Sequence, residues 1–310
     1  MTIEVVYYNE GEDPAEWLPA LRQALPEANI RLWKEGDVAP ADYALVWNAP
    51  KALFEGRRGL KAVFNLAAGV DALLASEVVP ENVPIFRLED AGMAVQIAEY
   101  AVYAVLRYFR RLDEYSKLQA EGQWGFLTPN DRNHFTIGIM GLGVMGTKAA
   151  AMLKPFGFPL KGWSRNRKTV PGVICYAGFE ELPSFLSDVN VLVCLLPNTS
   201  ETAGILNTDL FRMLPDGAAI VNLGRGALMN EDDLLEALAS RKLHGATLDV
   251  VANEPLSHGH PFWQHPNVML TPHIAGLTFC DETVAVVAQA VRCLERGEVP
   301  PGLVNRTKGY

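Results

Sequence analysis

The amino-acid sequence predicts an α/β protein with two units, each built on a parallel β-sheet. Short apolar runs alternate with helical patterns through the first hundred residues, and the same alternation restarts near residue 135. Strands that alternate with helices form parallel sheets covered on both faces. A length of 310 residues agrees with two units, because a domain commonly has about 100–200 residues.

The first unit is predicted to begin with a strand at Ile3–Tyr8 and a helix at Ala15–Ala24. Its further strands are expected at Asn29–Trp33, Tyr43–Trp47 and Ala62–Asn65. One long helical pattern then runs from about Gly92 to Leu118. A polar, aromatic stretch, Glu121–His134, separates this pattern from the second unit.

The second unit is predicted to begin with a strand at Phe135–Met140. Its later strands are expected at Leu160–Trp163, Val191–Leu195, Ala218–Leu223, Gly245–Asp249 and Val268–Leu270, with helices that include Met145–Phe156 and Glu231–Arg241. A last amphipathic helix, Asp281–Arg296, ends at Gly297, with Pro300 beyond it. From the pattern alone, this helix can pack on either unit.

The composition argues against several classes of function. A net charge of -9 disfavours general nucleic-acid binding, because a duplex requires a basic face. The four cysteines form no C-x-x-C pair, so neither a zinc site nor a disulfide framework is expected, and no metal is predicted. The N-terminus does not resemble a signal peptide, and no window approaches the roughly 20 apolar residues of a membrane span. We therefore expect a cytoplasmic protein without a membrane or nucleic-acid partner.

A glycine-rich turn follows the strand Phe135–Met140. Residues Gly141-Leu142-Gly143-Val144-Met145-Gly146 fit the pattern G-x-G-x-x-G, and a helical run follows them. In such a turn the first glycine permits the bend, the second leaves room for a pyrophosphate, and the third lets helix and strand pack closely. The start of the helix also attracts phosphates. An ordinary glycine-rich turn is the alternative, but this context favours a Rossmann-like nicotinamide dinucleotide site.

The end of the next strand bears on the choice between NAD and NADP. An NAD site places an acidic residue about 20 residues after the glycines, where it binds the ribose 2′-hydroxyl. Here no acidic residue lies between Gly146 and Glu180, and the strand runs into Ser164-Arg165-Asn166-Arg167-Lys168. Guanidinium groups match the geometry of a phosphate. Although a solvated basic loop is the alternative, Ser164, Arg165, Arg167 and Lys168 predict a 2′-phosphate site and hence NADP(H) over NAD(H).

Three polar residues follow later strands of the second unit: Arg225, Glu254 and His273. Ligands of open α/β sheets bind at these carboxyl ends of strands. An arginine can grip a carboxylate with two parallel hydrogen bonds, and a histidine can supply a proton near neutral pH. A carboxylate next to the histidine orients its ring. Taken singly, each residue is as consistent with a surface or structural role, but the set fits reduction of a 2-keto acid.

The order of these motifs resembles the D-2-hydroxyacid dehydrogenase family over essentially the whole chain. The resemblance is carried by the glycine turn, Asn222-Leu223-Gly224-Arg225-Gly226, Leu248-Asp249-Val250 with Glu254-Pro255, and Thr271-Pro272-His273-Ile274-Ala275-Gly276. Further stretches that resemble family members reducing glyoxylate and hydroxypyruvate include Trp163-Ser164-Arg165 and Leu196-Pro197-Asn198-Thr199. The resemblance implies NADPH-dependent reduction of glyoxylate to glycolate and of hydroxypyruvate to glycerate.

The resemblance also implies roles for individual residues. Arg225, Glu254 and His273 match the catalytic residues of the family. The substrate would be bound by the N–H groups of the Asn65–Asp71 loop and by side chains of the pocket, with the set Trp47, Ala68, Gly69, Val70, Arg225 and His273. The cofactor set is Gly141, Leu142, Gly143, Val144, Met145, Gly146, Trp163, Ser164, Arg165, Arg167, Lys168, Leu196, Pro197, Asn198, Leu223, Gly224, Arg225, Asp249, His273, Ala275 and Gly276.

The architecture that the resemblance implies has two domains with the active site in the cleft between them. Residues 1–100 with 275–310 would bind the substrate, and residues 101–274 would bind the cofactor. Family members are dimers through the cofactor domains, and Trp124 is expected either to reach the partner subunit or to pack in its own. One departure is Gly224, where many relatives carry a larger residue. The missing methyl is expected to loosen the fit around the nicotinamide.

Two other functions fit the same residues. A reductase of another small 2-keto acid would use the same carboxylate grip and the same proton donor. A non-catalytic protein that senses nucleotides on this fold is the second alternative, because a fold does not by itself establish a function. Glu254 argues against a formate dehydrogenase, which carries glutamine at the matching position.

Overall fold

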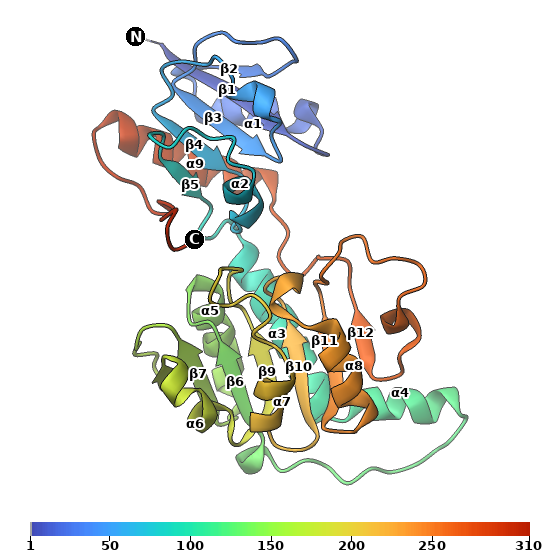
Figure 1. The fold of residues 1–310 in the computed structure, drawn as a ribbon. Helices are drawn as coiled ribbons and strands as arrows, with labels where there is room; N and C mark the ends of the chain where they lie inside the picture. Colours follow the sequence, from blue (N-terminus) through green and yellow to red (C-terminus); the bar gives the residue numbers. More distant parts are fainter. Residues whose placement is uncertain (1) are drawn as a thin grey trace. The chain divides into compact units, whose positions relative to one another are not determined.

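The computed structural model describes residues 2–310, which divide into two compact units. The first unit contains the residues up to Gly92 together with Thr278–Tyr310, and the second contains Met93–Leu277. Figure 1 shows a twisted parallel sheet with flanking helices in each unit. The predicted fold class, two parallel-sheet α/β units, is confirmed.

The first unit holds a five-stranded parallel sheet in the order β2-β1-β3-β4-β5, which is a flavodoxin-like order. The elements are β1 (Ile3–Asn9), α1 (Pro14–Ala24), β2 (Ala28–Leu32), β3 (Tyr43–Trp47), β4 (Ala62–Asn65), α2 (Asp71–Ala75), β5 (Ile85–Arg87) and α9 (Cys280–Glu295). Helix α1 begins where Asp13 accepts a hydrogen bond from Ala15 N at 2.8 Å, with Pro14 as the first helical residue.

Helix α9 belongs to this unit and packs against α1, which settles the choice that the sequence pattern left open. Arg292 of α9 donates to Glu27 at 2.8 Å. Glu295 accepts hydrogen bonds from Tyr43 at 2.6 Å and from Lys61 at 2.7 Å, and the Lys61 and Tyr43 bonds lower the pKa of Glu295. The last helix is therefore bonded to residues more than two hundred positions earlier in the chain.

The second unit holds a seven-stranded parallel sheet in the order β12-β11-β10-β9-β6-β7-β8. Its first six strands in sequence follow the Rossmann order, with the switch point between β6 and β9. The elements are α3 (Met93–Phe109), α4 (Leu112–Ala120), β6 (Thr136–Met140), α5 (Val144–Leu153), β7 (Leu160–Ser164), β8 (Ile174–Ala177), α6 (Leu182–Leu186), β9 (Val189–Cys194), α7 (Thr208–Met213), β10 (Ala218–Asn222), α8 (Glu231–Ala239), β11 (Leu243–Leu248) and β12 (Val268–Leu270).

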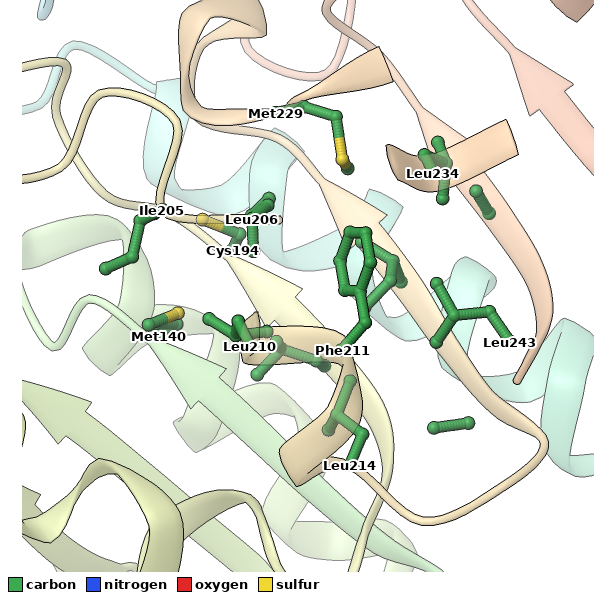
Figure 2. Close-up of a cluster of buried hydrophobic side chains, with 14 of the residues drawn as sticks. Met140, Cys194, Ile205, Leu206, Leu210, Phe211, Leu214, Met229, Leu234 and Leu243 are labelled. Atoms are coloured by element: carbon green, nitrogen blue, oxygen red, sulfur yellow. The ribbon is translucent and has the colours of Figure 1, made fainter. Parts of the chain in front are cut away.

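Two hydrophobic cores cover the faces of this sheet. Successive residues of β9 alternate between them: Leu192 and Cys194 join the core under α6, α7 and α8, whereas Val191 and Val193 join the core under α3 and α5. Figure 2 shows part of the first core, with Phe211 of α7 near its centre, Met140 and Cys194 on one side of that ring, and Leu234 and Leu243 on the other. Both faces being buried explains why these strands read as nearly continuous apolar runs.

The prediction of one long helix from Gly92 to Leu118 is wrong. The segment forms two helices, α3 and α4, which are separated at Arg111, where φ is 57°. The Arg111 guanidinium binds Glu114 with two bonds of 2.7 Å and also donates to Thr128 O at 2.8 Å. The bond to Thr128 O, in the segment after α4, therefore stabilises the break. The hydrophobic pattern does not reveal this break, because α3 and α4 are both amphipathic.

A second difference concerns His244, for which the sequence shows no partner. In the structure its Nε2 lies 2.7 Å from Oδ2 of the buried Asp113, so this pair joins α4 to the start of β11. Burial raises the pKa of Asp113, but the hydrogen bond and charge of His244 outweigh it, and the pKa lies below its usual value. Strands β5 and β8, which end their sheets by pairing with β4 and β7, were also not predicted.

Among residues 2–310, no helix combines the length and the apolarity that crossing a membrane requires. The four cysteines are free thiols.

Candidate active site

The glycine turn lies between β6 and α5, at the switch point of the second sheet. Gly141 has φ of 107°, and a Cβ there would lie 2.7 Å from Leu195 O. A Cβ on Gly146 would lie 1.8 Å from Gly141 O, so helix and turn touch backbone to backbone. By contrast, a Cβ on Gly143 would meet none of the described atoms within 4 Å. A side chain thus has no room at the first and third glycines of the turn. Beside the second glycine there is free space, next to the first N–H groups of α5.

The loop after β9 flanks this open space and fits a polar ligand. Leu196 is buried, and Thr202 Oγ donates to Pro197 O at 2.6 Å, which braces the loop. Asn198 Oδ1 is buried and has no hydrogen-bond partner among the described residues. A buried acceptor without a partner costs free energy unless a ligand or water satisfies it. Together with the space at Gly143, it indicates that the residues present suit a bound dinucleotide.

The predicted 2′-phosphate residues lie at and after the end of β7, and each has a hydrogen-bond or ion-pair partner of its own. Ser164 Oγ donates to Asn166 O at 2.8 Å, and Arg165 pairs with Glu201 at 2.6 Å. Arg167 contacts Cys175 O and the carboxylate of Glu181, while Lys168 Nζ donates to Leu142 O at 2.8 Å. Arg165 and Ser164 thus stand at the strand end itself, and the other two cations brace neighbouring loops. The Trp163 side chain is buried in the core and donates to Gly178 O at 2.8 Å.

His273 and Glu254 form a direct pair. His273 Nδ1 lies 2.8 Å from Glu254 Oε2, and both side chains are about half exposed. Because a carboxylate only accepts, Nδ1 carries the hydrogen of this bond, and Nε2 is left for another partner. The backbone of His273 has φ of 56° and donates to Asp249 O at 2.8 Å. The histidine is therefore held by its ring and by its main chain.

Asp249 organises the loop that carries His273. Its buried carboxylate accepts hydrogen bonds from Thr271 Oγ at 2.6 Å and from Ile274 N and Ala275 N, each at 2.9 Å. Since the Thr271 hydroxyl donates its hydrogen to Asp249, Tyr100 of α3 donates to Thr271 at 2.6 Å. Burial raises the pKa of the Tyr100 phenol, which favours its protonated form. Asp249 thus anchors the His273 loop to the body of the second unit.

Arg225 follows β10, and its backbone is shaped by Asn222. The fully buried Asn222 side chain donates to Arg225 O at 3.0 Å and accepts from Gly224 N at 3.2 Å. Arg225 Nη1 donates to Gly224 O at 2.8 Å. The next residue, Gly226, packs so closely on the loop after β11 that a Cβ would lie 1.8 Å from Val251 O. Val251 N in turn donates to Glu254 Oε1 at 3.3 Å, so the Arg225 and Glu254 loops support each other.

The expectation that Gly224 loosens its surroundings is wrong. A Cβ at this position would lie 2.7 Å from Leu196 O and 2.9 Å from Leu228 Cδ1. The glycine therefore permits a close approach between the loops after β9 and β10, and it leaves no void where a methyl is missing.

The predicted substrate residues of the first unit lie at the ends of its strands. Trp47 is the last residue of β3 and is half-buried. Asn65, buried at the end of β4, donates to Ala67 O at 3.1 Å and to Gly69 O at 2.8 Å. Within residues 2–310, the N–H groups of Ala68 and Gly69 donate to no acceptor. The side chain of Asn65 thus holds this loop through the carbonyls of Ala67 and Gly69. The N–H groups of Ala68 and Gly69 remain available to a ligand.

Several residues that hold this site in place were assigned no positioning role from the sequence, namely Asn65, Tyr100, Asn222, Glu231 and Thr271. Asn222 and Asn65 carry a recognisable signal, because each is an amide that ends an apolar strand. Glu231, the first residue of α8, has no such signal. Its carboxylate accepts a hydrogen bond from Ala252 N at 2.9 Å and lies 3.3 Å from His260 Nε2. Glu231 therefore contacts both the Ala252 loop and the His260 segment.

Comparisons with known proteins agree with this arrangement. The family described as D-isomer specific 2-hydroxyacid dehydrogenase, NAD binding domain, matches residues 102–275. A glyoxylate/hydroxypyruvate reductase A from Citrobacter koseri is 52% identical over 313 residues, which cover 99% of this chain and 100% of the relative. The protein of the same name from Salmonella newport is 49% identical over the same shares of both chains.

Solved structures of related proteins superpose on the whole chain. A D-isomer specific 2-hydroxyacid dehydrogenase from Xanthobacter autotrophicus Py2, in complex with NADPH and MES, gives a TM-score of 0.95 with 36% identity and covers 100% of both chains. An NADPH-dependent glyoxylate/hydroxypyruvate reductase from Sinorhizobium meliloti, in complex with NADP and sulfate, gives 0.93 with 33% identity and covers 99% of this chain and 100% of that one. Since the matched segment holds both the glycine turn and the His273–Glu254 pair, the chain belongs to the D-isomer specific 2-hydroxyacid dehydrogenase family.

Proposed function

We propose that this protein is an NADPH-dependent reductase that converts glyoxylate to glycolate and hydroxypyruvate to glycerate. The observation that carries the proposal is the His273–Glu254 pair, 2.8 Å apart, in loops that follow the strands of a dinucleotide-binding sheet. The relatives named glyoxylate/hydroxypyruvate reductase A, which match almost the whole chain, support the choice of substrate.

In this function some residues of the site transfer the proton and others bind the substrate. When bound, NADPH supplies a hydride to C2 of the keto acid. His273 donates the proton from Nε2 to the carbonyl oxygen, while Glu254 holds the ring through Nδ1 and stabilises its charged form. Arg225 binds the substrate carboxylate and polarises the adjacent carbonyl. In the first unit, the groups that we assign to substrate binding are the N–H groups of Ala68, Gly69 and Val70 and the side chain of Trp47.

The proposed cofactor site uses the remaining predicted residues. The pyrophosphate binds at Gly141–Gly146 and the first turn of α5, where the space at Gly143 supports this placement. The loop Leu196–Asn198 passes the riboses, and the orphaned Oδ1 of Asn198 supports that role. Leu223, Gly224, Asp249, Ala275 and Gly276 border the nicotinamide. Ser164 and Arg165 bind the 2′-phosphate, and Arg167 and Lys168 brace the loops around them.

Steady-state oxidation of NADPH with glyoxylate and with hydroxypyruvate tests the activity. We expect turnover with both acids. Tight NADPH binding without turnover of any small 2-keto acid would instead identify a nucleotide-sensing protein, and turnover of a different keto acid only would identify another reductase.

Replacement of Arg165 by Asp tests the cofactor preference. We expect the Michaelis constant for NADPH to rise by a factor of about 30 or more, because a guanidinium–phosphate bond is lost and a like charge takes its place. The constant for NADH should change by no more than about threefold. Parallel titrations with both cofactors check this, and an equal rise for the two would refute the 2′-phosphate site.

Alanine at two glycines of the turn should separate folding from cofactor binding. Gly146→Ala places a Cβ 1.8 Å from Gly141 O, so we expect the melting temperature to fall by more than about 5 °C. Gly143→Ala meets none of the described atoms, so its melting temperature should stay within about 2 °C while the Kd for NADPH rises at least about tenfold. Thermal melts without cofactor and fluorescence titrations measure the two effects. A Gly143→Ala variant that binds NADPH normally would place the pyrophosphate elsewhere.

We also propose that the protein is a cytoplasmic homodimer that associates through its second unit. Trp124 and Phe126, in the segment after α4, expose 105% and 84% of their reference areas, and exposed aromatic side chains are enriched at interfaces. The four free thiols are typical of a reducing compartment. Light scattering should give about twice the chain mass of 34.0 kDa, and a mass of one chain would contradict the dimer.

A further inference from the structure

The arginine assigned to the 2′-phosphate already has an anionic partner. Arg165 Nη2 lies 2.6 Å from Oε2 of Glu201, with side chains 34% and 54% exposed. Arg165 follows β7, and Glu201 lies in the loop after β9. Since β6 lies between these two strands in the sheet, the ion pair bridges the carboxyl end of β6, where the glycine turn begins. It therefore joins two loops across the side of the sheet at which a dinucleotide would enter.

The other two cations that follow β7, Arg167 and Lys168, bind different groups. Arg167 contacts Cys175 O and Glu181, and Lys168 donates to Leu142 O. Arg165 is thus the guanidinium at the strand end, and Glu201 contacts it through a carboxylate oxygen. Glu201 also lies three positions after Asn198, whose buried Oδ1 lacks a partner among the described residues. The loop after β9 consequently carries both Asn198, whose carbonyl oxygen suits the cofactor, and Glu201, whose carboxylate contacts Arg165.

We propose that Glu201 is a specificity-determining residue, whose carboxylate competes with the 2′-phosphate of NADPH for the Arg165 guanidinium. The proposal rests on the 2′-phosphate site described above. A phosphate monoester carries about −1.5 to −2 charges at pH 7, so it repels a carboxylate that contacts the same guanidinium. NADH has a hydroxyl in place of the phosphate and does not compete for Arg165. Glu201 therefore weakens NADPH binding selectively and limits the preference of the protein for NADPH over NADH.

Equilibrium binding to the Glu201→Gln variant tests the proposal without turnover. Nicotinamide fluorescence titrations give the Kd for NADPH and for NADH. We expect the NADPH constant to fall about three- to tenfold and the NADH constant to stay within about twofold, as removal of one exposed like charge implies. Glu180→Gln is the matched control, because it removes the same charge from an exposed glutamate near the same edge of the sheet. We expect it to change neither constant, and thermal melts verify that both variants fold.

Combination with Arg165→Gln shows whether Glu201 acts through the arginine. If the two anions compete for Arg165, most of the gain from Glu201→Gln disappears in the Arg165→Gln background. A gain that persists undiminished would show a general charge effect and overturn the proposal. Weaker NADPH binding by Glu201→Gln would also overturn it, since Glu201 would then orient Arg165 for the phosphate.

The same measurements separate this inference from the proposed function. If Arg165→Gln leaves the ratio of the NADPH and NADH constants unchanged, the 2′-phosphate site itself is wrong. If Arg165→Gln changes that ratio but Glu201→Gln does not, only the competition is refuted.

Discussion

Replacement of His273 by glutamine should lower kcat for glyoxylate reduction by a factor of about 10²–10⁴, which is the usual range for loss of a general acid. The Kd for NADPH should stay within about twofold, because the histidine acts in proton transfer. Glutamine can still bond to Glu254, but it offers no titrating nitrogen to the substrate. The loop should keep its form, since Asp249 holds it through His273 N, Ile274 N and Ala275 N. Steady-state kinetics and fluorescence titration measure the two constants.

Glu254→Gln is the matched variant for this experiment. An amide oxygen still accepts the hydrogen from His273 Nδ1, but it cannot stabilise a charged imidazolium. We therefore expect a smaller loss in kcat than for His273→Gln, because the imidazole keeps its orientation and its proton-bearing nitrogen. A His273→Gln variant with near-normal kcat and a normal melting temperature would show that another group delivers the proton.

Replacement of Gly226 by alanine should lower kcat/KM at least about a hundredfold and reduce the melting temperature by several degrees. The new Cβ would lie 1.8 Å from Val251 O and 2.0 Å from Val251 C, so the loops after β10 and β11 must move apart. Arg225 precedes Gly226 directly, and Val251 N donates to Glu254, so the movement displaces two proposed catalytic side chains at once. Kinetics with glyoxylate and a thermal melt measure the two effects.

Gly259→Ala is the control, because it lies in the loop that follows Glu254. Its Cβ would meet none of the described atoms within 4 Å, and its φ lies outside the left-handed region. We expect it to leave both kcat/KM and the melting temperature unchanged. If Gly226→Ala behaves in the same way, the two catalytic loops are not held by this contact.

Much of the fold could be predicted because its signals are local. Strands such as Tyr43–Trp47 and Val189–Cys194 are apolar on both faces, as expected when helices cover both sides of a parallel sheet. The glycine turn is equally local, since its spacing follows from contacts between neighbours such as Gly146 and Gly141. Strands β5 and β8 were not predicted, because they form by pairing with β4 and β7, and no local pattern records that pairing.

The proposed catalytic pair could also be inferred from sequence, because carboxyl ends of parallel strands meet at one edge of a sheet. That rule brings Glu254 and His273 to the same edge, and the distance of 2.8 Å between them agrees with it. The same rule gives no information on side-chain partners. It therefore led to four separate polar groups around a 2′-phosphate, whereas Arg167 and Lys168 bind groups in other loops.

By itself, the sequence determined the alternation of strands and helices, the position of the dinucleotide turn and the residue types available for chemistry. These depend on hydrophobic periodicity and on glycine spacing, which act over a few residues. Only the tertiary structure decided the break at Arg111, the anchoring of the His273 loop by Asp249, the close contact at Gly224 and the pairing of Arg165 with Glu201. Each of these is a contact between segments far apart in the chain, and its free energy depends on packing that no local pattern records.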